Sequence, residues 1–415
     1  MAVFSNLLSK LSLTTVGQGA AILLAAMLPI STAATSVLVI VILLTWLGPK
    51  EWGIKKALLT CHPLVIAIYP LVGLVLLGAF YSVGEKTAMW NSLLDSVRLL
   101  LIPVLLYFYQ NEKVAKAALW AFVGAMILTL LLAYLKVYAG LPIGLKYTTG
   151  AIFKSHIKTS FFMSIAAFLL ALHLPRSRFR VGIVLLIGLM IYYLLCMSIG
   201  RIGYVTLVIC FVALAWFYYR WKGIIGSIIL ATLLLGTAYL TSDVFSKRVN
   251  LLSQDLDLYY QGGRLLDSSL GSRLQFAKTS LQLIMQHPWL GWGTGSFGEA
   301  YQQFHAQEKT LLTDNPHNEY LRMGVEGGLA GIILLLFLFY RQWQLAQQLT
   351  LPWQQVMQAV LLAFMAGCFF NSWIKDSTEA YFYCVITAIC FSQLPLSKKE
   401  VIKPRAAGLF QRCLH

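Results

Sequence analysis

The residues most able to do chemistry stand at the start of a hydrophobic segment, in the run from Asp314 to Tyr320. Asn315 has a typical N-cap side chain, and Pro316 suits the first helical position because the N–H group that it lacks has no helical partner there. His317 would then lie in the first turn, among backbone N–H groups that attract anions and disfavour a charged imidazole ring. We therefore predict that His317 is neutral and acts as a base beside a bound anion.

Basic residues could bind the oxygens of that anion. Arg201 follows Gly200 at a turn between two hydrophobic segments, and Arg273 begins a polar helix predicted over residues 272–286. Taken alone, each arginine is as typical of a membrane interface or a solvated helix face as of a site. Two guanidinium forks near a helix N-terminus would, however, suit a pyrophosphate. A further basic cluster, which could support the site, comprises Lys146, Lys154 and Lys158.

Polar residues next to His317 could orient the site. Asn318 and Glu319 follow the histidine directly, and Glu326 lies inside the hydrophobic segment. A carboxylate in a membrane must face a cavity or a partner, so Glu326 could orient the site or only hydrogen-bond within the helix bundle. Close helix packing in this segment is predicted from its small residues, Gly324, Gly327, Gly328 and Gly331.

Two motifs resemble ligand sites that their context does not support. The stretch Gly293–Gly298 fits G-x-G-x-x-G, but no βαβ unit surrounds it, so we interpret it as a glycine-rich turn packed by aromatic residues. Asp255 and Asp257 form a D-x-D pair, which we interpret as part of an exposed loop. We therefore predict neither a metal site nor a cofactor.

The composition places these residues in a membrane protein. Hydrophobic residues make up 59% of the 415 residues, charged residues only 12%, and the mean hydropathy is +0.73. Apolar runs of roughly 14 to 25 residues are typical of helices and not of a β-barrel. We predict an all-α polytopic membrane protein with about twelve transmembrane helices. The net charge of +16 reports orientation and anionic lipid rather than nucleic acid, since no soluble basic domain exists to hold it.

One long polar segment interrupts the predicted spans. Residues 1–240 hold about nine spans, residues 319–395 about three, and residues 396–415 form a basic tail. The segment 241–318 is far longer than an ordinary connection, and we predict a functional loop that contains helices. The spans are predicted near residues 20–28, 33–48, 57–81, 97–110, 114–138, 157–173, 180–198, 202–219, 224–241, 319–340, 356–373 and 379–395.

The distribution of basic residues predicts the orientation. Lysines and arginines recur in alternate connections and in the tail, which places those connections and both termini in the cytoplasm. The loop 241–318 then lies outside, and Arg201 and His317 lie on the same outer side.

Several of these segments together resemble the O-antigen ligase and polymerase superfamily. The resemblance rests on Arg273, on the stretches His287–Phe297, His317–Leu321 and Glu326–Gly331, and on Ser198–Tyr204, which is similar to an upstream arginine motif of that superfamily. It implies a GT-C-like glycosyltransferase in the inner membrane of a Gram-negative bacterium, with its active site facing the periplasm.

The resemblance also implies the substrates and the roles of the site residues. The donor would be an O-antigen glycan on undecaprenyl pyrophosphate, and the acceptor a sugar hydroxyl of the lipid A-core. Arg201 and Arg273 match the essential arginines of the family, and His317 matches its essential histidine. The reaction would be an inverting transfer that needs no metal or cofactor, with His317 as general base.

Four functions remain to be separated. An O-antigen ligase is favoured over an O-antigen polymerase and a protein O-oligosaccharyltransferase, because the outer loop before the His-Asn-Glu helix, although long for a connection between spans, is short for this superfamily, and no added C-terminal domain is evident. The alternative of a different class is a lipid-linked glycan transporter. We expect a transporter to show broken helices or charges buried at mid-membrane depth.

Overall fold

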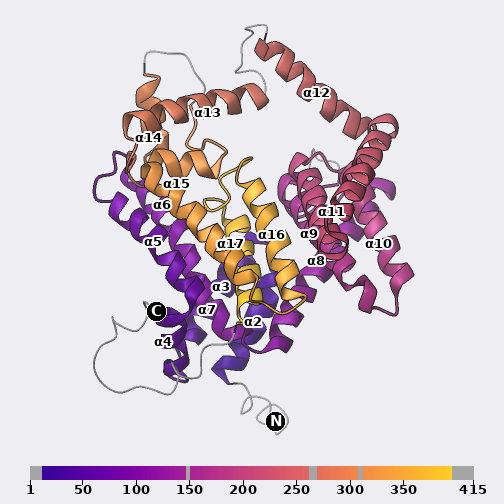
Figure 1. Cartoon of the computed structure of the whole chain (residues 1–415), viewed down its shortest axis with the longest axis horizontal. Coiled ribbons are helices and arrows are strands. Elements are labelled where there is room, and N and C mark those ends of the chain that lie inside the picture. The colour runs from indigo at the N-terminus through magenta and orange to yellow at the C-terminus, as the bar shows by residue number, and fades with distance from the viewer. Residues whose placement is uncertain (1–11, 146–149, 261–268, 307–311, 395–415) are drawn as a thin grey trace.

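A computed structural model shows a helical protein and describes residues 12–145, 150–260, 269–306 and 312–394 (Figure 1). No β-strand occurs in these ranges, so the all-α fold is confirmed for the described chain. The helices are α2 (Leu13–Met27), α3 (Thr32–Trp46), α4 (Trp52–Cys61), α5 (Pro63–Gly78), α6 (Lys86–Val97), α7 (Leu101–Tyr109), α8 (Glu112–Tyr138), α9 (His156–His173), α10 (Arg180–Tyr192), α11 (Arg201–Thr241), α12 (Asp243–Tyr260), α13 (Ser269–Gln286), α14 (Phe297–Phe304), α15 (Glu319–Ala346), α16 (Trp353–Gly367) and α17 (Ser377–Phe391).

Six described helical segments are long and apolar enough to cross a bilayer, and one bent pair would make a seventh. They are α6 joined to α7, α8, α9 with the turn after it, α10 with the π-helical turn that follows it, α11 and α15. The apolar helices α2, α3 and α17 are shorter. The protein is therefore a polytopic membrane protein, while the number of about twelve spans stays a prediction.

The segment expected to form one span over residues 57–81 is divided in two. α4 ends at Cys61, α5 begins at Pro63, and the two helices are bent by 63°. Pro63 has no N–H group to continue the helical ladder, and the residue before a proline favours an extended backbone, as His62 has at ψ 120°. A single straight span is therefore wrong for this range.

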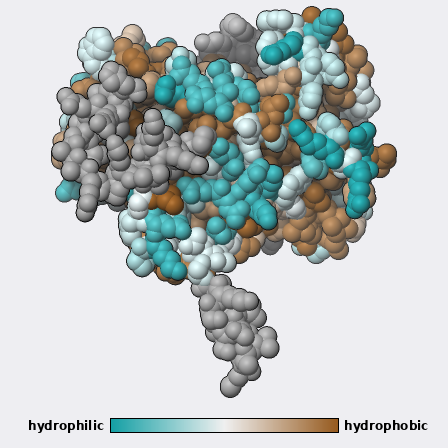
Figure 2. Space-filling model, turned by 60° about the horizontal axis from the view of Figure 1, so that its bottom comes forward, coloured by the Kyte–Doolittle hydropathy of each residue, from teal (hydrophilic) through white to brown (hydrophobic). Residues whose placement is uncertain are grey.

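The long polar segment 241–318 folds as helices at one end of the molecule. α12, α13 and α14 lie together at the top of Figure 1, and α4 lies at the opposite end. Phe276 of α13 and Tyr301 of α14 share a small apolar core with Val325 of α15, which fastens these helices to the bundle. In the view turned towards the end with α4, hydrophilic side chains occupy much of the centre and hydrophobic ones lie along the sides (Figure 2).

The helix predicted over residues 272–286 ends where expected, at Gln286, but begins three residues earlier than expected. α13 begins at Ser269, so Ser272 lies within the helix and is not its N-cap. Its buried face carries Phe276 and Leu283, whereas Leu281 and Met285 are 54% and 71% exposed.

The aromatic core of the bundle anchors the connection between α16 and α17. The Trp373 ring in this connection is 4.4 Å from the Phe161 ring of α9 and 5.2 Å from the Phe364 ring of α16. Gly367 leaves room for the indole, because a Cβ atom there would overlap it. Residues 368–376 are therefore held against the core, next to the start of α15.

α15 breaks at Gly328, where φ is 63° and ψ is −157°. Residues 288–293, after α13, fill the break. Four backbone hydrogen bonds join the two segments: Trp292 N to Val325 O at 2.8 Å, Gly293 N to Glu326 O at 3.0 Å, Leu329 N to Pro288 O at 2.7 Å, and Ala330 N to Trp289 O at 3.2 Å. They replace helical bonds that the break removes. Of the stretch Gly293–Gly298, the first part forms a turn packed against α5 through Thr294, and Phe297 and Gly298 begin α14.

The substitution Gly328→Ala should destabilise the fold by roughly 2–5 kcal/mol, because this backbone conformation is almost confined to glycine and the new Cβ would overlap the Trp289 backbone. Thermal unfolding in detergent would show this as a lower midpoint. Gly226→Ala in α11 is the control, since a Cβ there meets nothing within 4 Å. Equal midpoints for the two variants would contradict the assignment of strain to the break.

Candidate active site

His317 lies just before α15 and not in its first turn. α15 begins after Asn318, whose side chain caps the helix by accepting a hydrogen bond from Leu321 N at 3.0 Å. The Asn315 side chain instead accepts from His317 N at 2.9 Å, in a local turn that competes with helix formation. The expectation that Asn315 is the N-cap is therefore wrong. His317 has a φ of 52°, a left-handed conformation that is uncommon outside glycine and is often found at functional sites.

The first turn of α15 is also less available to an anion than we expected. Glu319 N donates to Cys368 O at 2.7 Å, Leu321 N to the Asn318 side chain, and Arg322 N to Asn318 O at 3.0 Å. Most N–H groups of this turn thus already have partners within the protein. An anion near His317 needs other donors.

The connection between α16 and α17 holds the imidazole ring. His317 Nδ1 lies 2.9 Å from Asn371 Oδ1, and the amide nitrogen of Asn371 donates to Asp376 Oδ2. Ser372 Oγ donates to Asn315 Oδ1 at 2.8 Å, which ties the turn before His317 to the same connection. Sequence reasoning missed these residues because it placed residues 356–373 inside a span.

These contacts determine which imidazole nitrogen carries the proton. The Asn371 amide nitrogen is engaged with Asp376, so the oxygen of the amide faces His317 and can only accept. His317 Nδ1 must then be the donor, and the lone pair of Nε2 is left free. A neutral histidine of this tautomer can take a proton through Nε2.

Glu319, Arg322 and Glu326, which follow His317 on α15, form a buried ionic cluster. Arg322, 1% exposed, donates to Glu319 Oε1 at 2.5 Å and to Glu326 Oε2 at 3.0 Å, and Ser92 Oγ donates to Glu326 at 3.1 Å. Glu319 Oε2 accepts from Ile374 N at 2.9 Å. Glu319 and Glu326 therefore support the fold around His317, and the expected partner for Glu326 is confirmed. The spacing of Arg322, three residues after one glutamate and four before the other, could have revealed the cluster.

The two predicted arginines lie near each other and have no partner among the residues that the structure describes. Burial and, next, the positive charge of Arg201 lower the pKa of the Arg273 guanidinium. Within the described residues, neither side chain forms an ion pair or a hydrogen bond to protein. Arg201 begins α11 directly after a π-helical turn, Tyr193–Met197, and Gly200 lets α11 approach α9, because a Cβ there would overlap Ser160. Two adjacent cations without counter-charges suit a multiply charged anion.

α13 connects the arginines to the histidine. Phe276 lies three residues after Arg273, and therefore on the same side of the helix, and its ring lies 6.2 Å from the His317 ring at an angle of 31°. α13 is fixed against α15 where Ile284 contacts Gly324. The arginine pair and the free Nε2 of His317 therefore belong to one region.

Residues 185–336 match the family model described as O-antigen ligase. Over these residues, about a third of the chain, the protein is similar to the O-antigen ligase family. A search of curated proteins found no match for the chain. The matched segment runs from α10 to the middle of α15 and contains Arg201, Arg273 and His317. Asn371 and Asp376, which orient the histidine, lie outside it.

The two described members of the lysine cluster, Lys154 and Lys158, contact helices outside the matched segment. Lys158 forms an ion pair of 3.2 Å with Glu379 of α17, and Lys154 donates to Thr32 Oγ1 of α3. Burial and then the charge of Lys158 lower the pKa of Lys154. Lys146 lies outside the described residues. A supporting role for these lysines stays a prediction.

The described residues contain no group of three or more His, Cys, Asp or Glu side chains arranged to hold a metal ion. The backbone of Asp255 and Asp257 lies in helix α12 and not in a loop, while their side chains lie outside the described part of the chain. Metal independence of the protein stays a prediction that needs a measurement.

Proposed function

We propose that the protein is an O-antigen ligase, which transfers the glycan of an undecaprenyl-pyrophosphate donor to a sugar hydroxyl of the lipid A-core. One observation carries this proposal: Arg201 and Arg273 lie near each other without a counter-charge among the described residues, in the segment that is similar to the O-antigen ligase family and that also holds His317. A lipid-linked pyrophosphate is an anion of the size and charge that two arginine forks bind.

The proposed reaction divides the work between the arginines and the histidine. The acceptor oxygen forms a bond to the anomeric carbon while the bond from that carbon to the pyrophosphate oxygen breaks, so the configuration inverts. The hydroxyl proton goes to His317 Nε2, and the pyrophosphate leaves with the electron pair. Arg201 and Arg273 stabilise the negative charge that grows on the leaving group.

The proposed orientation puts this site in the periplasm and both termini in the cytoplasm. It is supported by basic residues in connections that alternate with those of the site, at Lys50, Lys56, Lys113, Lys116, Arg176, Arg178, Arg180, Lys222 and Arg341. The basic tail 396–415 lies outside the described residues.

Reconstitution tests the proposal directly. The purified protein would be placed in liposomes with lipid-linked O-antigen and rough lipopolysaccharide, with and without a chelator. We expect glycan on the lipid A-core in both cases. A longer lipid-linked glycan without that product would identify a polymerase, glycan on protein would identify a protein O-oligosaccharyltransferase, and loss of transfer with chelator would contradict metal independence.

The transporter alternative needs its own measurement. Broken helices were expected of a transporter, but the structure contains them, so their presence does not distinguish a transporter from an enzyme. α11 breaks at Arg220 and α15 at Gly328, and Arg322, Glu319 and Glu379 are buried, although we expected such features of a transporter. In the same liposomes, movement of lipid-linked glycan between leaflets without any transfer would favour the transporter.

A further inference from the structure

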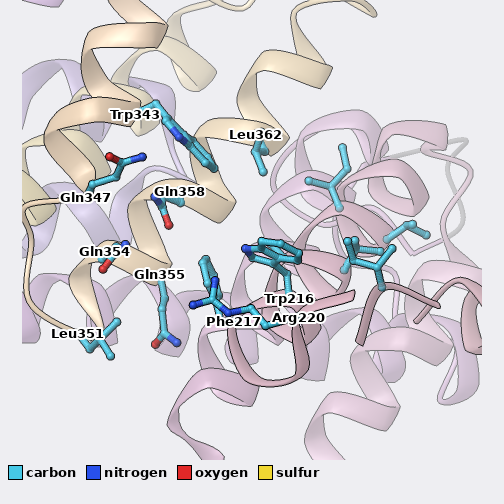
Figure 3. A pocket seen from close by; sticks show the side chains of 15 residues that line it. Trp216, Phe217, Arg220, Trp343, Gln347, Leu351, Gln354, Gln355, Gln358 and Leu362 are labelled. Carbon is cyan, nitrogen blue, oxygen red and sulfur yellow. The ribbon is translucent and has the colours of Figure 1, made fainter. Parts of the chain in front are cut away.

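A cleft opens between α11 and the α15–α16 hairpin, away from the candidate active site (Figure 3). Its volume is about 870 Å³. Its walls are largely apolar and aromatic, with Trp216 and Phe217 on α11, and Trp343 and Leu362 on the opposite side. Arg201 and Arg220 are 19 residues apart on the first part of α11, which corresponds to about 28 Å along a helix. The cleft begins at Val208, seven residues after Arg201, but an anion held at Arg220 lies about 28 Å along the helix from Arg201 and is therefore distinct from a pyrophosphate bound at the arginine pair.

Two glutamines of α16 present their amides to this cleft. Gln355 and Gln358 are 6% and 5% exposed as whole residues, and neither side chain forms a hydrogen bond to a described residue. Both line the cleft, as do Gln347 and Gln354 (Figure 3). Amides that face a largely apolar cleft can donate hydrogen bonds to a ligand with polar oxygens.

The cleft is also lined by a positively charged residue, Arg220. Arg220 lies at the break of α11, with φ 53° and ψ −135°, and its guanidinium is 5.5 Å from the Trp216 ring centre. It is exposed and forms no ion pair with a described carboxylate. The cleft thus combines apolar walls, amide donors and an uncompensated positive charge, which matches an anionic amphiphile.

We propose that this cleft binds one anionic phospholipid of the surrounding bilayer. The phosphate lies at Arg220, the glycerol ester oxygens accept hydrogen bonds from Gln355 and Gln358, and the acyl chains cover the walls formed by Val212, Phe217 and Leu362. The lipid fills the seam between α11 and α16, the helices on either side of the cleft. This site does not depend on the proposed transfer activity.

Native mass spectrometry of the full-length protein with added lipid tests the proposal. Phosphatidylglycerol should remain bound to the protein after collisional activation in the mass spectrometer. Phosphatidylcholine should bind at least about tenfold more weakly, because it has no net negative charge to pair with Arg220. Arg220→Gln should weaken phosphatidylglycerol binding about tenfold and abolish most of that preference. Gln355→Leu should weaken both lipids and leave the fold intact, because the replacement is apolar and similar in size.

Arg178→Gln is the matched control. Arg178 is also exposed, also lies over an aromatic ring, at 4.8 Å from Phe179, and is outside the cleft. Its replacement should leave phosphatidylglycerol binding unchanged. Equal retention of the two lipids by the unmodified protein, retention of neither, or the same loss in the Arg178 and Arg220 variants would each overturn the proposal.

Discussion

Replacing either Arg201 or Arg273 by glutamine should lower kcat for glycan transfer by about 10²–10³-fold, the usual loss when one donor to a developing negative charge is removed. The two guanidinium groups lie near each other, and neither has a counter-charge in the described part of the chain, so both are available to the leaving pyrophosphate. Lysine at either position should recover only part of the rate, because it keeps the charge and loses the planar fork. The measurement is the initial rate of transfer to the lipid A-core at saturating donor.

The double variant tests whether the two arginines act on one group. If both bind the same pyrophosphate, the loss in the Arg201→Gln, Arg273→Gln variant should be smaller than the product of the single losses. Lys278→Gln is the control, since Lys278 is exposed on α13 and carries the same charge five residues from Arg273. Losses that multiply fully, or a comparable loss in the control, would show that the arginines do not share a ligand.

The helices were predictable because the membrane demands long apolar runs, but the places where they end or break were not always visible. Pro63 follows only two polar residues, Thr60 and His62, within a largely apolar run, and α4 and α5 are bent by 63° at this point. The break at Gly328 is stabilised by backbone groups of residues 288–293, far away in sequence. A pattern read along one segment cannot show that another segment will replace its hydrogen bonds.

The site was predictable where residue type alone carries the chemistry. The sequence indicated two arginines and a histidine on one side of the membrane, and in the structure α13 carries Arg273, which lies near Arg201, and Phe276, which lies near His317. The local geometry at His317 was not predictable, because Asp314, Asn315 and Asn318 all have side chains that can cap a helix. Asn318 does so in the structure, and this choice moves His317 out of the helix and into contact with Asn371.

Replacing His317 by alanine should lower kcat by about 10²–10⁴-fold, the range typical for loss of a general base, with little change in the thermal midpoint. His317 is only partly buried and lies outside α15, so its removal leaves no large cavity. His305→Ala is a contrasting variant: its ring is buried and its Nε2 lies 2.9 Å from Thr279 Oγ1, so the loss should appear in stability. Full activity in a folded His317→Ala protein would exclude the histidine as the base.

Asn371→Leu should show how much of the rate depends on the orientation of the His317 ring, because this variant keeps the histidine and removes the side chain that orients it. Without the Asn371 oxygen, Nδ1 loses its acceptor and the ring can populate the tautomer with the proton on Nε2, which cannot accept one. We expect kcat to fall about 10–100-fold with the acceptor KM unchanged, and no further loss when Asn371→Leu is added to His317→Ala. ¹⁵N NMR spectra of histidine-labelled protein measure the tautomer directly. The His317 resonances are assigned by their absence in His317→Ala. They should report a proton on Nδ1 in the unmodified protein and not in Asn371→Leu. A signal unchanged by Asn371→Leu would mean that Asn371 does not determine the tautomer, and that any loss of rate in this variant has a purely structural cause.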